Sequence, residues 1–351
     1  MGEVVRIGVV GLGWVGTARH LPTIYSENTL RLVGVADRQG GRAREIAARA
    51  GHIRASQAAR LDDIDWIEEV DAISVATAPM AHHDLVCAAL QRGLHVITEK
   101  PFAMSVAEGE SMLAAAANAR RTLAVVHNFQ FARSMMRLKR DLANGQLGKI
   151  RGVRAIQMGN PARRLPTWYE ELPLGLFYDE SPHLLYLLSS VAGDLNLLKA
   201  VSAESRRGNA TPSQIDAWFD APGTDYPITL SCNFESALSE WHLLVHGSKG
   251  VGIVDIFRDI YLRLPNDGGH GTTEVLKTSI AATAQHWWQH IASGVPHVTG
   301  KLRYGNDEVF RRFAAAAAGD AGALEPISAV MAQRILTLQH SIIDHRERLY
   351  T

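Results

Sequence analysis

The sequence predicts an α/β protein with two domains, a doubly wound parallel sheet over residues 1–126 and an α+β domain over residues 127–351 with a mostly antiparallel, open sheet. Short apolar runs alternate with helix-like segments through the first 126 residues, a pattern typical of βαβ units. Beyond residue 127 the β-type runs lengthen and alternate apolar with polar residues, which indicates a sheet with one covered face. A length of 351 residues suits two cores.

The first domain follows a regular order of strands and helices. Helices are expected from about residue 17 and over residues 41–50, 81–91 and 106–119, the last beginning with a capping box formed by Ser105 and Glu108. Buried strands are expected over residues 4–10, 30–36, 72–76, 95–98 and 123–126.

The second domain is expected to contain strands over residues 150–158, 200–205, 214–219, 228–234, 241–247 and 250–257. Helices are expected over residues 134–144, 181–191, 280–293, 306–318 and 327–348, and the last of them are expected to pack back on the first domain. An open sheet face needs a cover, so we expect a homodimer or homotetramer that forms through this face.

The composition favours a protein that acts on small molecules. Lys and Arg together number 36, as do Asp and Glu, so the overall charge indicates neither a nucleic acid nor an anionic membrane as partner. No targeting segment is recognisable at the N-terminus, and no run approaches the roughly 20 apolar residues that span a bilayer. Cys87 and Cys232 lie in apolar periodic segments as expected of buried thiols, which favours the reducing cytoplasm.

A glycine-rich loop follows the first apolar run. In a G-x-G-x-x-G pattern the first glycine permits a tight turn, the second lets backbone N–H groups approach a pyrophosphate, and the third lets helix and strand pack closely. The N-terminus of the following helix adds partial positive charge. The alternative is that these glycines only end a strand, because such glycines would show the same sequence pattern. With its surroundings, the loop predicts dinucleotide binding by Gly11, Gly13, Trp14, Val15 and Gly16.

An acidic residue, Asp37, ends the second apolar run, 21 residues after Gly16. A dinucleotide-binding fold places a carboxylate at about this distance to accept hydrogen bonds from the adenosine ribose. Such a carboxylate would repel a 2′-phosphate, so we expect NAD as cofactor in preference to NADP. The neighbouring Arg38 keeps NADP open, because a guanidinium could stack on adenine or pair with a 2′-phosphate. The alternative for both residues is a solvated turn.

A short motif, Glu99-Lys100-Pro101, directly follows the fourth predicted strand. Ligands of open α/β sheets bind beyond the carboxyl ends of the strands, so Lys100 is expected where nicotinamide and substrate meet. A partly buried lysine there can polarise or protonate a substrate oxygen. Pro101 would fix the turn, and a cis bond is one way to do so. The alternative is an ordinary surface lysine in a strand-to-helix loop.

These motifs together resemble the Gfo/Idh/MocA family of glucose-fructose oxidoreductases and inositol dehydrogenases. The resemblance extends through the chain and includes Ala76-Thr77-Ala78-Pro79 with His83, and Asp179-Glu180-Ser181-Pro182-His183. It implies a nicotinamide-dependent oxidoreductase for a sugar, polyol or related carbohydrate, with Lys100, Asp179 and His183 as the catalytic group. It also implies cofactor contacts from Thr77, Pro79, His83, Glu99, Lys100 and Asn128.

The spacing of Asp179 and His183 supports this assignment, because residues four apart share one face of a helix. In the mechanism we expect, His183 takes the proton of a substrate hydroxyl, Lys100 stabilises the oxygen, and Asp179 orients hydroxyls or the imidazole. Lys100 could carry the proton instead. The chain departs from the family's D-x-G-x-H-x-x-D pattern, since Ser181 replaces the glycine and Tyr186 the second aspartate.

Three further residues are candidates for substrate contact. Arg163 and Trp168 lie in a loop that is expected to border the substrate, where arginine suits a carboxylate or phosphate and an aromatic ring suits a sugar, and Tyr178 thickens the pocket wall. An exposed loop that packs on the domain or a partner is the alternative. For Trp287 and Trp288 we expect a core or interface role. The histidine pairs lack carboxylate or cysteine companions at ligand spacing, so no metal is expected.

Two other functions stay open from the sequence. The resembled family includes regulators that bind a dinucleotide without catalysis, and enzymes such as hydrolases or epimerases that use bound NAD transiently. Release of NADH into solution separates the three, because only a dehydrogenase shows it.

Overall fold

The computed structural model describes residues 4–349, and the chain divides into two compact units. The first unit comprises the chain up to Asn128 together with Asn306–Thr337, and the second comprises Phe129–Gly305 and the residues from Leu338 on. The division is therefore not a simple split into N-terminal and C-terminal halves, because a late segment belongs to the first unit.

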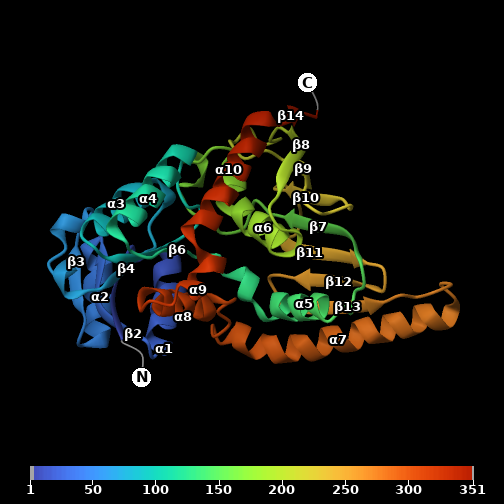
Figure 1. The fold of residues 1–351 in the computed structure, drawn as a ribbon, viewed down its shortest axis with the longest axis horizontal. Coiled ribbons are helices and arrows are strands. Elements are labelled where there is room, and N and C mark those ends of the chain that lie inside the picture. The colour runs from blue at the N-terminus through green and yellow to red at the C-terminus, as the bar shows by residue number, and fades with distance from the viewer. Residues whose placement is uncertain (1–3, 350–351) are drawn as a thin grey trace. The chain divides into compact units, whose positions relative to one another are not determined.

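The first unit contains a six-stranded parallel sheet in the order β3-β2-β1-β4-β5-β6 (Figure 1). The order reverses between β1 and β4, and ligands of open α/β sheets bind at such a switch point, beyond the carboxyl ends of the strands. Strand β3 was not predicted, because its sequence Arg-Ala-Ser-Gln is a short polar edge strand without an apolar run. The strands are β1 Val5–Val10, β2 Leu30–Asp37, β3 Arg54–Gln57, β4 Ala72–Val75, β5 His95–Thr98 and β6 Leu123–Val125.

The helices of the first unit follow the predicted order. The capping box of α4 is present, since the backbone N–H of Glu108 donates to Ser105 Oγ at 3.1 Å. A short π-helix, η1, spans Gly16–His20 directly after the glycine loop. The α-helices are α1 Leu21–Ser26, α2 Gly40–Ala50, α3 His82–Gln91, α4 Val106–Ala119, α8 Asn306–Ala317 and α9 Ala321–Leu324, and α10 Ala329–His345 contributes residues to both units.

The second unit contains an eight-stranded sheet in the order β13-β12-β11-β7-β10-β9-β8-β14. It is mostly antiparallel, as predicted, and the pairs β7–β10 and β8–β14 are parallel. Strand β13, Ile260–Pro265, was not predicted. It follows the predicted run over residues 250–257 after only a short turn, and the sequence analysis did not separate it as a further strand. The strands are β7 Ile150–Met158, β8 Asn196–Ala203, β9 Gln214–Asp220, β10 Ile228–Asn233, β11 Glu240–Gly247, β12 Gly250–Asp255, β13 Ile260–Pro265 and β14 Glu347–Arg348.

One face of this sheet carries the core of the second unit. Helix α6 (Leu176–Ala192) packs on β7, β10 and β11, and α5 (Arg133–Ala143) packs on β12 and β13. Val153 and Leu243 on this face are fully buried, whereas Trp218, which points to the other face, is 39% exposed. Helix α7 (Thr272–Val298) runs along β13 (Figure 1) and is far longer than predicted. None of the helices within residues 4–349 is both long enough and apolar enough to cross a membrane.

Candidate active site

The glycine loop joins β1 to the first helical turn at the switch point of the parallel sheet. Gly11 has a φ of +95°, and a Cβ there would lie 2.7 Å from the backbone of Ala76. A Cβ at Gly16 would lie 2.2 Å from the carbonyl oxygen of Gly11. At Gly13, by contrast, a Cβ would meet no atom within 4 Å. The first and third glycines are therefore needed by the fold, whereas the second leaves open the space that a pyrophosphate needs.

Asp37 holds this loop in place. Its Oδ2 accepts the backbone N–H of Leu12 at 2.7 Å, and its Oδ1 accepts that of Gln39 at 2.7 Å. The side chain is buried, while the neighbouring Arg38 is exposed. Each carboxylate oxygen has a second lone pair, so Asp37 retains acceptor capacity for a ribose hydroxyl.

Glu99 is buried at the end of β5 and is paired with a histidine from the first helical turn. Nε2 of His20 donates to Oε1 of Glu99 at 2.8 Å, and the hydroxyl of Ser74 lies 2.6 Å from Nδ1 of the same ring. Burial raises the pKa of Glu99, but the hydrogen bond and charge of His20, together with Lys100, outweigh it and leave the pKa below its ordinary value. Glu99 therefore stays ionised beside Lys100.

The loop that carries Lys100 is fastened to the loop after β4 through His82. Nδ1 of His82 lies 2.9 Å from the carbonyl oxygen of Pro101, and Nε2 lies 3.2 Å from that of Thr77. Burial lowers the pKa of His82, so its ring is neutral and donates to one carbonyl at a time. The Lys100–Pro101 peptide bond is cis. Lys100 itself is half-buried.

Two buried hydroxyls at this sheet edge lack a hydrogen-bond partner, Thr77 Oγ1 after β4 and Thr98 Oγ1 at the end of β5. Buried polar groups are seldom left unpaired in a protein, so these two fit a polar ligand at the carboxyl edge. His127 and Asn128 follow β6 at the same edge and are buried. Burial lowers the pKa of His127 to about 3, although the nearby Glu99 opposes the shift.

The other predicted cofactor residues of the first unit lie around these loops. Trp14 is half exposed, and the guanidinium of Arg19 lies 4.9 Å from its ring centroid. Val15 is half-buried next to it, and Pro79 is buried at the start of a 3₁₀ turn. His83 is turned toward α4, with Nε2 at 3.2 Å from Ser111 Oγ.

In the second unit, His183 on α6 lies within an aromatic cluster. Its Nδ1 is 2.8 Å from the hydroxyl of Tyr186, which also accepts the backbone N–H of Phe129 at 3.1 Å. The rings of Phe129 and Trp241 lie 4.8 and 5.5 Å from the imidazole, centroid to centroid. Trp241 is buried, and its indole N–H has no acceptor.

Asp179 and Glu180 are neighbours on α6 but have different surroundings. Asp179 is half-buried one turn before His183. Glu180 is turned about 100° around the helix and is buried against β7, where it accepts hydrogen bonds from Gln157 and Arg163. Arg163 therefore has its charge balanced by Glu180, and its contact with a substrate carboxylate or phosphate stays a prediction.

Tyr178 and Trp168 also differ from each other. The Tyr178 side chain is fully buried, and its hydroxyl lies 3.0 Å from Nε2 of His340. The structure thus buries Tyr178 in the first turn of α6, and its contact with a substrate stays a prediction. Trp168 is half-buried in the loop before α6, and its contact with a substrate stays a prediction.

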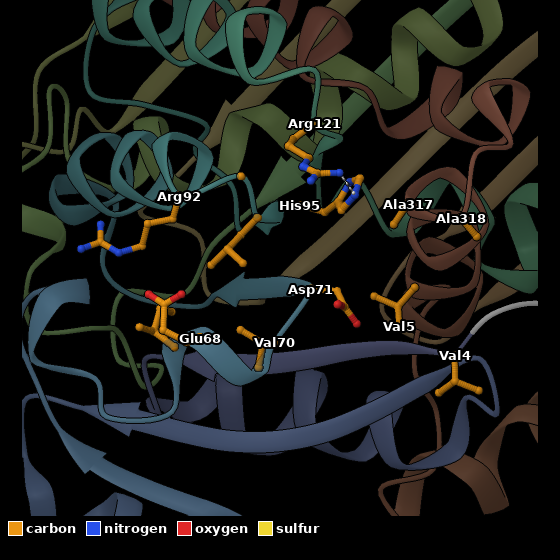
Figure 2. Close-up of a pocket in the computed structure, with 13 residues that line it drawn as sticks. Val4, Val5, Glu68, Val70, Asp71, Arg92, His95, Arg121, Ala317 and Ala318 are labelled. Carbon is orange, nitrogen blue, oxygen red and sulfur yellow. Dashed lines mark hydrogen bonds between the residues drawn. The ribbon is translucent and has the colours of Figure 1, made fainter.

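A pocket of about 390 Å³ opens at the opposite edge of the parallel sheet, at the amino ends of β1, β4 and β5. Figure 2 shows Arg121 and His95 pointing toward each other there, whereas Arg92 points away from them. Because the glycine loop and Lys100 lie at the carboxyl ends of these strands, this pocket does not belong to the candidate active site. Residues 4–349 contain no cluster of three or more His, Cys, Asp or Glu side chains that could hold a metal ion.

The sequence analysis did not predict the contacts that four residues make in the site. They are His20, His82, Glu180 and Tyr186. The partners of His20 and His82 are 79 and 19 residues distant in the chain, so no local pattern marks them. Tyr186 was noted only as a departure from a motif. Its position three residues after His183, on the same helix face, is the signal that could have identified it.

The parallel sheet, the glycine loop and the buried Asp37 define a dinucleotide-binding Rossmann domain. Residues 5–127 match the family model described as "Oxidoreductase family, NAD-binding Rossmann fold", Gfo/Idh/MocA. The resemblance to the Gfo/Idh/MocA family is thereby confirmed over residues 5–127, which form an NAD-binding Rossmann domain of the oxidoreductase type.

Curated relatives and solved structures agree with this assignment. The chain is 25% identical over 253 residues, 71% of either chain, to the uncharacterised oxidoreductase YdgJ of Escherichia coli. It is 30% identical over 192 residues to myo-inositol 2-dehydrogenase of Thermotoga maritima, an alignment that covers 54% of this chain and 55% of that protein. The WlbA dehydrogenase of Bordetella pertussis, crystallised with NADH and UDP-GlcNAcA, has the same fold, with a TM-score of 0.75, 18% identity, and 98% and 95% of the chains covered.

Proposed function

We propose that the protein transfers hydride between a nicotinamide cofactor and a hydroxyl or carbonyl carbon of a sugar, polyol or sugar derivative. The observation that carries the proposal is the carboxyl edge of the parallel sheet, where the open space at Gly13, the buried Asp37 and the ion-paired loop of Lys100 follow three of its strands. The relative named myo-inositol 2-dehydrogenase supports the substrate class.

The cofactor fits the residues of this edge. Backbone N–H groups of the glycine loop would hold the pyrophosphate, and the remaining lone pairs of Asp37 would accept a ribose hydroxyl, which favours NAD over NADP. The unpartnered hydroxyls of Thr77 and Thr98 would bond to the polar groups of the nicotinamide half. The bound nicotinamide supplies or accepts the hydride.

The proton is assigned to His183. If Nδ1–H donates to Tyr186, the ring is the tautomer whose Nε2 can accept the proton of a substrate hydroxyl. Lys100 would donate to a substrate oxygen and stabilise its negative charge. Asp179 would orient neighbouring substrate hydroxyls.

The surroundings of His183 suit a carbohydrate. Phe129, half-buried beside His183, offers aromatic surface of the kind that packs on a sugar ring. The proposal therefore favours a polyhydroxylated ring over a small aliphatic alcohol.

The test is to titrate the purified protein with NADH and NADPH and then follow the nicotinamide absorbance with a panel of polyols, aldoses, uronates and nucleotide sugars. A substrate-dependent change that falls about 10²–10³-fold in Lys100→Met, with NADH affinity retained, is the expected result. Lys199→Met is the matched control, because Lys199 is exposed and pairs with Glu347 at the surface.

Two results would contradict the proposal. Tight NADH binding with no turnover on any compound would favour a regulator. Turnover of a substrate without net formation or loss of NADH would favour an enzyme that oxidises and re-reduces its substrate in one cycle.

A further inference from the structure

Helix α7 packs its polar face on the second unit and exposes its apolar face to solvent. A surface helix normally buries its apolar face against the core and exposes polar residues. Here the two fully buried residues of a 27-residue helix are Gln289 and Ser293, and large apolar side chains point to solvent.

The polar face of α7 seals the edge of the mixed sheet. Gln289 bonds both backbone groups of Tyr261 on β13, accepting its N–H at 2.9 Å and donating to its carbonyl oxygen at 2.5 Å. Gln285 does the same for Arg263, at 3.0 and 3.1 Å. These side-chain amides replace the neighbouring strand that β13 lacks, so the orientation of α7 is fixed by four hydrogen bonds.

The outward face of α7 is a continuous apolar stripe. Its seven members, which we call the α7 stripe, are between 58% and 86% exposed. From Trp288 onward their spacing is three, four and three residues, the spacing of a helix–helix seam. The members are Leu276, Ile280, Trp287, Trp288, Ile291, Val295 and Val298.

We propose that the α7 stripe binds the α7 stripe of a second copy of this chain, in an antiparallel pair related by a two-fold axis. Trp287 is midway between Leu276 and Val298, so such an axis passes near the tryptophan pair and places each aliphatic end of the stripe against the opposite end. Large aromatic side chains near the centre of an interface contribute most of its binding energy.

The charge of α7 favours a second copy over a lipid surface. Residues 278–298 contain no Asp, Glu, Lys or Arg, so two identical stripes meet without like-charge repulsion. Helices that lie on membranes carry Lys and Arg on their polar face, and α7 has a single lysine, Lys277.

The exposed area also suits a dimer. With about 150–250 Å² for each aromatic side chain and less for each aliphatic one, the α7 stripe exposes on the order of 800 Å². A standard interface buries about 800 Å² on each partner, and patches of this size are unusual on monomers.

The test measures mass in solution by light scattering and sedimentation. The wild-type chain is expected at about twice the mass of one chain, and Trp288→Glu with Ile291→Glu is expected at the mass of one chain, with an unchanged circular dichroism spectrum. Leu198→Glu is the matched control, because Leu198 is 64% exposed on β8, and it should leave the mass unchanged. A wild-type monomer, or a dimer that survives the double substitution, would overturn the proposal.

Two further arms distinguish other occupants. Trp218→Glu tests the open face of the sheet, and loss of the dimer in this variant alone would assign the interface to that face instead. Binding of the wild-type chain to phosphatidylcholine vesicles, abolished by the double substitution, would assign the α7 stripe to a membrane. A symmetric disulfide in Trp287→Cys, formed under mild oxidation and absent in Leu198→Cys, would support the antiparallel pair independently.

Discussion

The hydroxyl of Tyr186 lies 2.8 Å from Nδ1 of His183 and also accepts the backbone N–H of Phe129. The resembled family often has an aspartate at the position of Tyr186, where a carboxylate would stabilise a protonated imidazole. A neutral phenol fixes the orientation of the ring but contributes less to the stability of the imidazolium. This pair therefore determines how readily His183 takes a proton.

Replacing Tyr186 with Phe should reduce kcat by roughly 10–100-fold, because His183 loses the group that orients it. The pH profile of kcat/KM is the measurement that distinguishes a positioning role from lost stability. Tyr186→Asp should move the limb of the profile that reports the base toward higher pH, since a carboxylate favours the charged imidazole. If neither substitution moves that limb, His183 is not the base and Lys100 carries the proton.

Gly13→Ala should separate cofactor binding from folding. A Cβ at Gly13 meets no protein atom within 4 Å, so the unfolding free energy should stay within about 0.5 kcal/mol of the wild type. The same methyl group would occupy the space of the pyrophosphate, so NADH affinity should fall at least about tenfold, or about 1.4 kcal/mol. Fluorescence titration with NADH and a urea melt give both quantities.

Gly11→Ala is the comparison, because φ at Gly11 is +95° and a Cβ there would contact the Ala76 backbone. That variant should lose stability and binding together. Normal NADH binding by Gly13→Ala would remove the glycine loop from the cofactor site.

The sequence was sufficient for most of the fold and for the local part of the site. Apolar runs predicted five of the six parallel strands, and the glycine loop with Asp37 predicted the cofactor edge. Strand β3 was missed because an edge strand needs no apolar run. The burial of the Tyr178 side chain was not predicted, because adjacency in sequence does not show which side of α6 faces the core.

The rest of the site depends on contacts between distant parts of the chain. His20 contacts Glu99 across 79 residues, and neither residue carries a local signal of the other. The tryptophan pair of α7 was expected in a core or an interface, and the structure removes the first alternative, since both side chains are more than 60% exposed. The hydrogen bonds to β13, between residues more than 20 positions apart, determine which face of α7 turns outward.

His127 should make the protein sensitive to acid. Its pKa is lowered to about 3 by burial, whereas an unfolded histidine titrates near 6.5. Below that value the unfolded chain binds a proton that the folded chain refuses, so stability falls as pH decreases from about 6.5 toward 3, by up to about 1.4 kcal/mol per pH unit. Urea melts measure the free energy of unfolding at pH 7 and at pH 5. Between pH 7 and pH 5 the wild type should lose about 2 kcal/mol more than His127→Gln.

His52→Gln is the control for this prediction, because His52 is exposed and should leave the pH dependence unchanged. An equal slope in wild type and His127→Gln would show that His127 is protonated in the folded protein.

Trp66 should make Gly34 irreplaceable. Gly8 on β1 and Gly34 on β2 are direct partners in the sheet, and the fully buried indole of Trp66 covers both. A Cβ at Gly34 would lie 2.6 Å from the indole, so Gly34→Ala should cost about 3 kcal/mol of unfolding free energy through overpacking. A Cβ at Gly41 on helix α2 would meet no atom within 4 Å. Gly41→Ala should therefore leave the free energy of unfolding unchanged or raise it slightly. Combining Gly34→Ala with Trp66→Leu should recover part of the loss, and a strictly additive double mutant would show that the indole is not the cause.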